Sequence, residues 1–164
     1  MAGVFFACKK GVWSMAYEKS KGLLQLATSY SNGNYTYTKI DGFIAAENLT
    51  TTPNQMQDLD SYVNANGRLK RTVLPHSRTK IEFNTPYLTS EKKKELIGLM
   101  VSAMSLKDGV CNATERKVRI RFYNDWLDDY EIARCYISDV SFQYYSKYKG
   151  SPLYLPIRIA FIEY

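Results

Sequence analysis

Residues 78–104 read RTKIEFNTPYLTSEKKKELIGLMVSAM, and this stretch decides the fold because two hydrophobic periods meet in it. Ile81 and Phe83 alternate with polar residues, a period of two that predicts a strand with one apolar face. After a Thr-Pro break, Thr89 or Ser90 can cap a helix over about residues 90–105. Apolar residues recur on one face of this helix: Leu96, Ile97, Met100, Val101 and Met104. The helix must pack on a sheet, because an isolated helix this short is marginal in water.

Composition favours a single, mainly β domain. The chain has 164 residues, enough for a hydrophobic core of its own. It contains 14 Tyr and 7 Phe but only 2 Trp, and tyrosine is enriched in strands and at contact surfaces. The net charge of +6 permits contact with nucleic acid or an acidic partner, but it does not bear on the fold.

The cysteines and the N-terminus give no sign of secretion. Cys8, Cys111 and Cys135 are odd in number and widely spaced, which predicts neither a disulfide framework nor a zinc site. Residues 1–13 do not have the pattern of a secretory signal, and no apolar run approaches the roughly 20 residues of a membrane span. We therefore expect a soluble protein that is made in a cytosol and has no membrane contact.

The N-terminal half is harder to assign. We interpret residues 1–38 as an extension with a short strand near Val4–Ala7 and a short helix within Ser14–Leu26, available for an extra contact between subunits. Asn32-Gly33 predicts a tight hairpin turn, and Tyr35, Tyr37 and residues 40–46 read as strand. Residues 39–164 are then the β domain. Residues 48–67 are polar and without clear periodicity, which predicts a long loop.

The C-terminal half reads as four strands. The clearest covers residues 117–123, and a carboxylate-rich turn leads from it to a returning strand at 131–137. Residues 140–145 and 154–163 supply two more strands, the last apolar on both faces and therefore covered on both sides. With the central strand and helix, this pattern predicts an α+β fold that is mainly β: an antiparallel sandwich or barrel with one flanking helix.

Groups typical of enzymes are scarce. His76 is the one histidine, in a strand-entry turn, and neither a Gly-x-Ser-x-Gly nor a phosphate-binding glycine loop is present. Asp125, Asp128 and Asp129 lack the ligand alternation of a calcium loop and are expected to form a solvated hairpin tip. We therefore expect no enzymatic activity, no cofactor, no bound metal and no small-molecule substrate.

Two segments are candidates for contacts. On the strand at 117–123, one face carries cations and a ring that could bind single-stranded nucleic acid: Lys117, Arg119, Arg121 and Tyr123. A simple water-facing surface is the interpretation we favour for these residues. Trp126 and Leu127, at a tip among aspartates, are better interaction candidates, because exposed tryptophans often anchor contacts, unless the ring folds back on its own sheet.

From about Asp58 onward, short motifs spread over about two thirds of the chain resemble a known family. They are Asp58–Ser61, Asn64–Gly67 with Arg71, Thr79–Phe83, Pro86–Glu91 and Phe161–Tyr164. In these motifs the chain resembles small, uncharacterised tail or baseplate structural proteins of tailed bacteriophages and prophages.

The resemblance implies a tail-tube-like fold whose identical copies close into a ring, expected to be hexameric, that contacts adjacent tail or baseplate proteins. DNA would be only transient cargo in the channel, and the protein would reside in the virion tail after synthesis in the bacterial cytoplasm. The segment from Asn48 to Arg71 would become ordered on assembly. Tube interiors of this kind are often acidic whereas this chain is basic, so an adaptor or baseplate position fits better than the lumen. The expected subunit-interface residues are Asp58, Tyr62, Asn64, Asn66, Arg71, Trp126 and Leu127.

Two alternatives remain open at the level of sequence. The first is a single-stranded nucleic-acid-binding β module that uses the cationic strand face. The second is a phage-encoded inhibitor of a host protein, for which the sequence contains no specific signal.

Overall fold

The computed structural model describes residues 17–164, which form ten strands, one α helix and two short 3-10 helices. The first elements are β1 (Leu24–Ser31), β2 (Asn34–Lys39), η1 (Asp41–Phe43), η2 (Ala46–Asn48), β3 (Thr50–Val63), β4 (Leu69–Asn84) and β5 (Leu88–Thr89). The remainder are α1 (Ser90–Met104), β6 (Lys117–Asn124), β7 (Asp129–Ile137), β8 (Tyr144–Tyr148), β9 (Ser151–Tyr154) and β10 (Arg158–Glu163).

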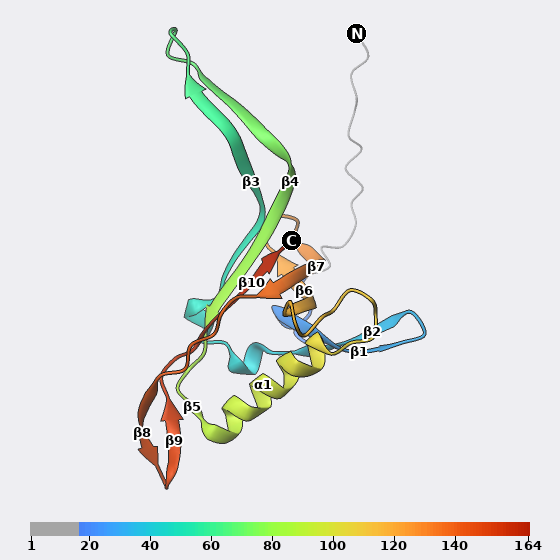
Figure 1. Ribbon diagram of the computed structural model, residues 1–164, viewed down its shortest axis with the longest axis vertical. Coiled ribbons are helices and arrows are strands. Elements are labelled where there is room, and N and C mark those ends of the chain that lie inside the picture. The colour runs from blue at the N-terminus through green and yellow to red at the C-terminus, as the bar shows by residue number, and fades with distance from the viewer. Residues whose placement is uncertain (1–16) are drawn as a thin grey trace, which may run out of the picture.

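These strands form two antiparallel sheets (Figure 1). The main sheet has the order β2-β1-β6-β7-β10-β4-β3, and the small sheet has the order β5-β9-β8. The predicted fold class, mainly β and antiparallel with one flanking helix, is confirmed. In place of a closed barrel, the main sheet is open, with β2 and β3 as its edge strands. The small sheet is connected to it through the segments that follow β4 and precede β10.

The core lies between α1 and the inner face of the main sheet. On the helix, Leu96, Met100 and Ala103 are buried, and α1 packs mainly against β1. Alternate residues of the strands complete this core: Leu24, Leu26, Ile81, Phe83, Val118, Ile120, Phe122, Ala133, Cys135, Ile137, Ile159 and Phe161. The predicted helix is therefore confirmed, and Thr89 is its N-cap, accepting a hydrogen bond from the Lys92 amide at 3.4 Å.

The predicted C-terminal strand is wrong at its start. Residues 154–163 do not form one strand, because the chain leaves the small sheet after Tyr154 and enters the main sheet at Arg158. Pro156 lies in the gap, and proline cannot donate a ladder hydrogen bond. The strand that was predicted over 140–145 instead begins at Tyr144.

The first described residues correct the prediction for the N-terminus. The expected strand at Val4–Ala7 lies outside the described residues, as do residues 14–16 of the expected helix. The rest of that helix prediction is wrong, because residues 17–23 form a turn and Leu24–Leu26 belong to β1. β1 pairs with β6 and contributes buried leucines, so residues 24–38 are part of the main sheet. Gly22 has a φ of +70°, which ends any right-handed helical turn before β1.

The turn between β1 and β2 follows the sequence signal. Asn32 and Gly33 both have positive φ, at 50° and 83°, as a two-residue hairpin turn of type I′ requires. Residues 40–46, expected as strand, instead contain η1 and lead into η2.

The predicted loop at 48–67 is wrong, because Thr50–Val63 is strand β3, paired with β4 in the isolated chain. The ladder is interrupted between Thr52 and Gln55 and again between Met56 and Asp58. Pro53 lies in the first interruption, and Pro75 lies opposite the second. Each irregularity shifts the side-chain alternation, since an inserted residue moves the following side chains to the other face. The bulges therefore hid the strand from an analysis of periodicity.

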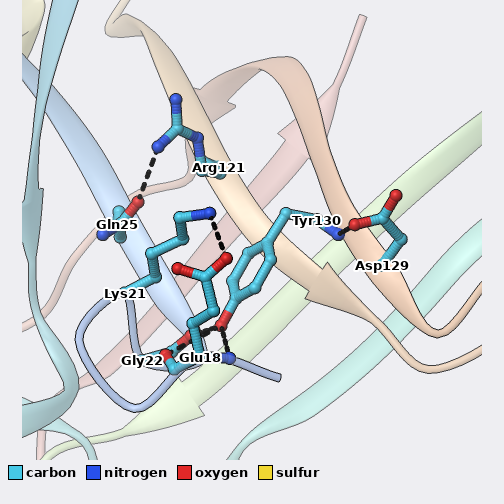
Figure 2. Close-up of polar contacts among 7 residues, drawn as sticks. All are labelled: Glu18, Lys21, Gly22, Gln25, Arg121, Asp129 and Tyr130. Carbon is cyan, nitrogen blue, oxygen red and sulfur yellow. Dashed lines mark hydrogen bonds and ion pairs between the residues drawn. The ribbon is translucent and has the colours of Figure 1, made fainter. Parts of the chain in front are cut away.

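A tyrosine ties the start of the described chain to β7 (Figure 2). The Tyr130 hydroxyl lies 2.8 Å from the Gly22 carbonyl oxygen and 3.2 Å from that of Glu18. Lys21 pairs with Glu18 at 2.7 Å and lies over the Tyr130 ring. These contacts hold the turn before β1 against the β6–β7 hairpin.

Gly22 gives a test of this turn. An added Cβ would collide with the Asp41 carboxylate, which accepts hydrogen bonds from the amides of Leu23 and Leu24. We expect Gly22→Ala to lower the free energy of unfolding by about 1–3 kcal/mol, because it also imposes a left-handed conformation on alanine. Urea unfolding monitored by circular dichroism measures the change.

Gly98→Ala is the matched control. A Cβ at this helical position meets no atom within 4 Å. The substitution should raise the free energy of unfolding by up to about 1 kcal/mol through helix propensity. Equal stability of the two variants would contradict this account of Gly22.

Candidate interaction surfaces

The distal part of the β3–β4 hairpin projects from the body of the molecule (Figure 1). Near its base, Thr50–Thr52 pair with residues 80–82, and β4 there lies next to β10 in the main sheet. Beyond the bulges, residues 58–63 pair with 69–73, and nearly every residue of this distal hairpin is exposed. It is therefore a two-stranded ribbon with both faces available.

Several predicted interface residues stabilise this distal hairpin internally. Arg71 Nη2 lies 2.6 Å from Asp58 Oδ1, and its Nε donates to the same carboxylate at 3.0 Å. This pairing raises the pKa of the Arg71 guanidinium. The Asn64 side chain accepts from the amides of Asn66 and Arg68 at 3.1 and 2.9 Å and closes the turn. Polar side chains of this set thus shape the hairpin, whereas Tyr62 stays 52% exposed.

Apolar side chains line the distal hairpin and are also exposed. Val63 and Leu69 are directly paired across the strands near the tip, and they are 63% and 62% exposed. Val73 follows on the same face, and Leu59 lies at a register shift with 68% of its surface exposed. Large apolar groups on a projection that lies away from its own core mark a contact surface.

A second projection is the turn between β6 and β7, which Asn124 organises. Asn124 is buried; its side chain donates to Glu131 at 2.6 Å and accepts from the Trp126 amide at 2.9 Å. Its carbonyl oxygen accepts from the Asp128 amide at 2.9 Å. The turn is thus held in one shape by its own hydrogen bonds.

This turn presents Trp126 and Leu127 to solvent, with 84% and 58% of their surfaces exposed. The ring does not fold back on the sheet. Asp125, Asp128 and Asp129 surround it, and the Tyr123 hydroxyl donates to Asp128. That hydrogen bond raises the pKa of Tyr123 to about 12. We call residues 125–129 the acidic tip.

Sequence reasoning missed an apolar groove of about 380 Å³ beside α1. Most of its apolar lining comes from the helix and from the segment after β7: Ile97, Met100, Val101, Met104, Val140 and Phe142. Val101 is 49% exposed and Phe142 41% exposed. The sequence did contain a signal of this groove: the apolar stripe on the predicted helix is wider than the part of α1 that the sheet buries. We call these six residues the α1 groove.

The cationic strand face is present, with all four predicted residues side by side on β6. Arg119 stacks over Tyr35 at 4.3 Å and Arg121 over Tyr37 at 3.9 Å, measured to the ring centroids. Lys117 pairs with Glu115 at 2.5 Å and lies over the Tyr164 ring. These cations therefore already have partners in their own chain.

The remaining reactive groups do not gather into a site within residues 17–164. His76 is exposed on β4, and no three His, Cys, Asp or Glu residues in this range could hold a metal ion. Burial raises the pKa of the Cys135 thiol to about 12. Burial and the hydrogen bond to Asp108 raise the pKa of the Cys111 thiol to about 12. Both thiols are therefore protonated at neutral pH.

No helix in the described part of the chain is long and apolar enough to cross a membrane.

Comparison with solved structures finds chains of similar outline in gene transfer agent particles. One belongs to the tail of an empty GTA particle with C6 symmetry; it is 12% identical, with a TM-score of 0.46, and the match covers 91% of this chain and 95% of that one. Another belongs to the virion of a native gene transfer agent (GTA) particle; it is 11% identical, with a TM-score of 0.40 and the same coverage.

Comparison with curated proteins finds no match. A protein-family model, described as a family of unknown function, matches residues 31–164, from the end of β1 to the C-terminus. The match thus extends over both sheets, α1, the distal hairpin and the acidic tip. The chain therefore belongs to the family of unknown function DUF6711.

Proposed function

We propose that this protein is a structural component of a bacteriophage tail, and that its copies assemble into a ring that joins neighbouring tail or baseplate proteins. The observation that carries the proposal is the distal hairpin, a projecting ribbon with exposed apolar residues. The motifs Asp58–Ser61 and Asn64–Gly67, by which the sequence resembles tail and baseplate proteins, both lie on it.

The physical reason is that a projecting ribbon lacks support from its own chain. Two-stranded hairpins are marginally stable in water unless another strand or a packed face supports them. Here the internal ion pair and the Asn64 turn hold the shape, while Val63 and Leu69 remain exposed. Packing against a neighbouring subunit would bury these side chains and stabilise the ribbon.

Ring closure would also cover the exposed edge strands of the main sheet. β2 and β3 are its outer strands, and an exposed edge strand can pair with another chain. A closed ring of identical subunits uses such surfaces in a limited assembly rather than in aggregation. We propose a hexameric ring at an adaptor or baseplate position, because the net charge of +6 suits a DNA-sliding lumen poorly. The role is structural and involves no catalysis.

The double variant Val63→Asp, Leu69→Asp tests the hairpin. Both side chains are exposed, so the fold should be kept; the free energy of unfolding should fall by no more than about 1 kcal/mol, since the two carboxylates lie directly opposite each other in the hairpin. Assembly should be lost, because two carboxylates would have to be buried at the contact. Native mass spectrometry and negative-stain microscopy, with and without adjacent tail proteins, measure the rings.

Ile132→Asp is the control, since it places a carboxylate at an exposed apolar position on β7, away from the hairpin. It should still assemble. A wild-type protein that stays monomeric and joins no ring or tail contradicts the proposal and favours the inhibitor alternative.

The double variant Arg119→Ala, Arg121→Ala distinguishes our proposal from the nucleic-acid alternative. Because Arg119 and Arg121 stack on tyrosines of β2, we expect Arg119→Ala, Arg121→Ala to lower the free energy of unfolding by about 1–2 kcal/mol in total. Oligonucleotide binding, measured by fluorescence anisotropy, should be weak and unchanged in the double variant.

Arg134→Ala is the matched control: it removes an exposed arginine opposite Arg119 on β7. It should leave stability within about 0.5 kcal/mol of the wild type. Tight, salt-sensitive oligonucleotide binding that the double variant abolishes would establish the alternative instead.

A further inference from the structure

Two features away from the distal hairpin are complementary in shape, polarity and charge: the acidic tip and the α1 groove. We infer that the acidic tip of one copy inserts Trp126 and Leu127 into the α1 groove of a second copy. The inference rests on the proposed assembly of identical subunits and names a contact within it, separate from the hairpin.

The α1 groove has the size and lining that an indole ring needs. Its volume of about 380 Å³ lies within the roughly 300–1,000 Å³ of pockets that bury drug-sized molecules. Met100 forms part of the floor at 4% exposure, whereas Val101 and Phe142 are exposed at the sides. Methionine is adaptable and pairs favourably with aromatic rings.

The acidic tip is preorganised to enter a pocket. Asn124 fixes the turn through hydrogen bonds to Trp126 and Glu131, so little conformational entropy is lost when the tip binds. Trp126, at 84%, is the most exposed of the large hydrophobic side chains whose burial the structure describes. Tryptophan is the residue type most enriched among the anchors that carry interface energy.

The charges around the two features have opposite sign. Asp125, Asp128 and Asp129 flank the tryptophan, and none of them forms a salt bridge within the described chain. Lys93 and Arg116 border the α1 groove. Arg116 also pairs with Asp139 at 2.8 Å, an exposed contact that leaves the guanidinium accessible. Opposite charges at the rim steer association and set its orientation.

The position of the two features requires a second copy. The acidic tip ends at Asp129, the first residue of β7, and the α1 groove includes Val140, shortly after the last residue of β7. Strand β7 runs from Asp129 to Ile137, and its nine residues span about 26 Å at roughly 3.3 Å per residue. The tip cannot reach its own groove across the length of a rigid strand. Between copies, such a head-to-tail contact uses two different surfaces, an arrangement that forms a ring when the rotation between copies closes and an open filament when it does not.

A mixing experiment with full-length variants tests the contact. Trp126→Ala removes the inserted ring but keeps the groove, and Val101→Asp places a charge in the groove but keeps the tip. Each variant alone should self-associate at least about tenfold more weakly than the wild type. A 1:1 mixture should form heterodimers, since one intact tip can still meet one intact groove. Sedimentation velocity over a concentration series measures both results.

Tyr145→Ala is the control, because it removes an aromatic ring of 62% exposure from the small sheet. It should associate like the wild type. The reversed pair Asp129→Lys with Lys93→Glu gives a second measurement: each single variant should weaken association, and their combination in one chain should restore it.

The outcomes separate this inference from the proposed ring. If wild type and Trp126→Ala form the same rings, the tip contact is overturned and the ring stands. If Trp126→Ala weakens association but Val101→Asp does not, the tryptophan meets another surface and the inference is likewise overturned. If the mixture forms heterodimers but no variant or wild type joins a ring or tail, the contact holds and the proposed function falls. A wild type that is monomeric throughout overturns both.

Discussion

The hydrophobic contact between α1 and the inner face of the main sheet positions every surface described above. Leu96, Met100 and Ala103 are buried against strands that lie far apart in the sequence, so that residues near 24, 81, 120 and 160 share one core. The same contact leaves the outer side of the helix free to form the α1 groove. Without this packing the helix would be marginal in water, so the groove beside it would be lost and the inner face of the sheet would be exposed.

Bulges decide which parts of the molecule reach outward. The start of β3 and the end of β4 lie in the main sheet, and the hairpin projects from it beyond the points where their ladder is interrupted, next to Pro53 and Pro75. Prolines are tolerated at edges and bulges because they do not donate a ladder hydrogen bond there. The resulting hairpin has no packed layer on either face. The Asp58–Arg71 ion pair and the hydrogen bonds of the Asn64 turn stabilise it in part.

The sequence predicted local structure well where one hydrophobic period ran without interruption. The helix at 90–104, the strand at 117–124 and the Asn32-Gly33 turn were all anticipated. It failed where a bulge changed the period, as in β3, and where Pro156 divided an apolar run between two sheets. Among the candidate contact residues, Trp126 was found correctly as an exposed group, but Asp58 and Arg71 turned out to be partners of each other. A side chain's polarity does not reveal whether its partner lies in the same chain.

The sequence by itself determined the mainly β class, the single amphipathic helix and the acidic, tryptophan-bearing turn, because each depends on residues that are close together in the chain. Only the tertiary structure decided that residues 50–63 pair with β4 in a projecting hairpin and that a groove forms beside α1, at the other end of β7 from the acidic tip. The hairpin depends on a strand register that bulges shift, and the groove depends on packing between α1 and residues 137–142, more than thirty residues further along the chain. Such contacts form from shape and burial in three dimensions, which no local pattern of residues records.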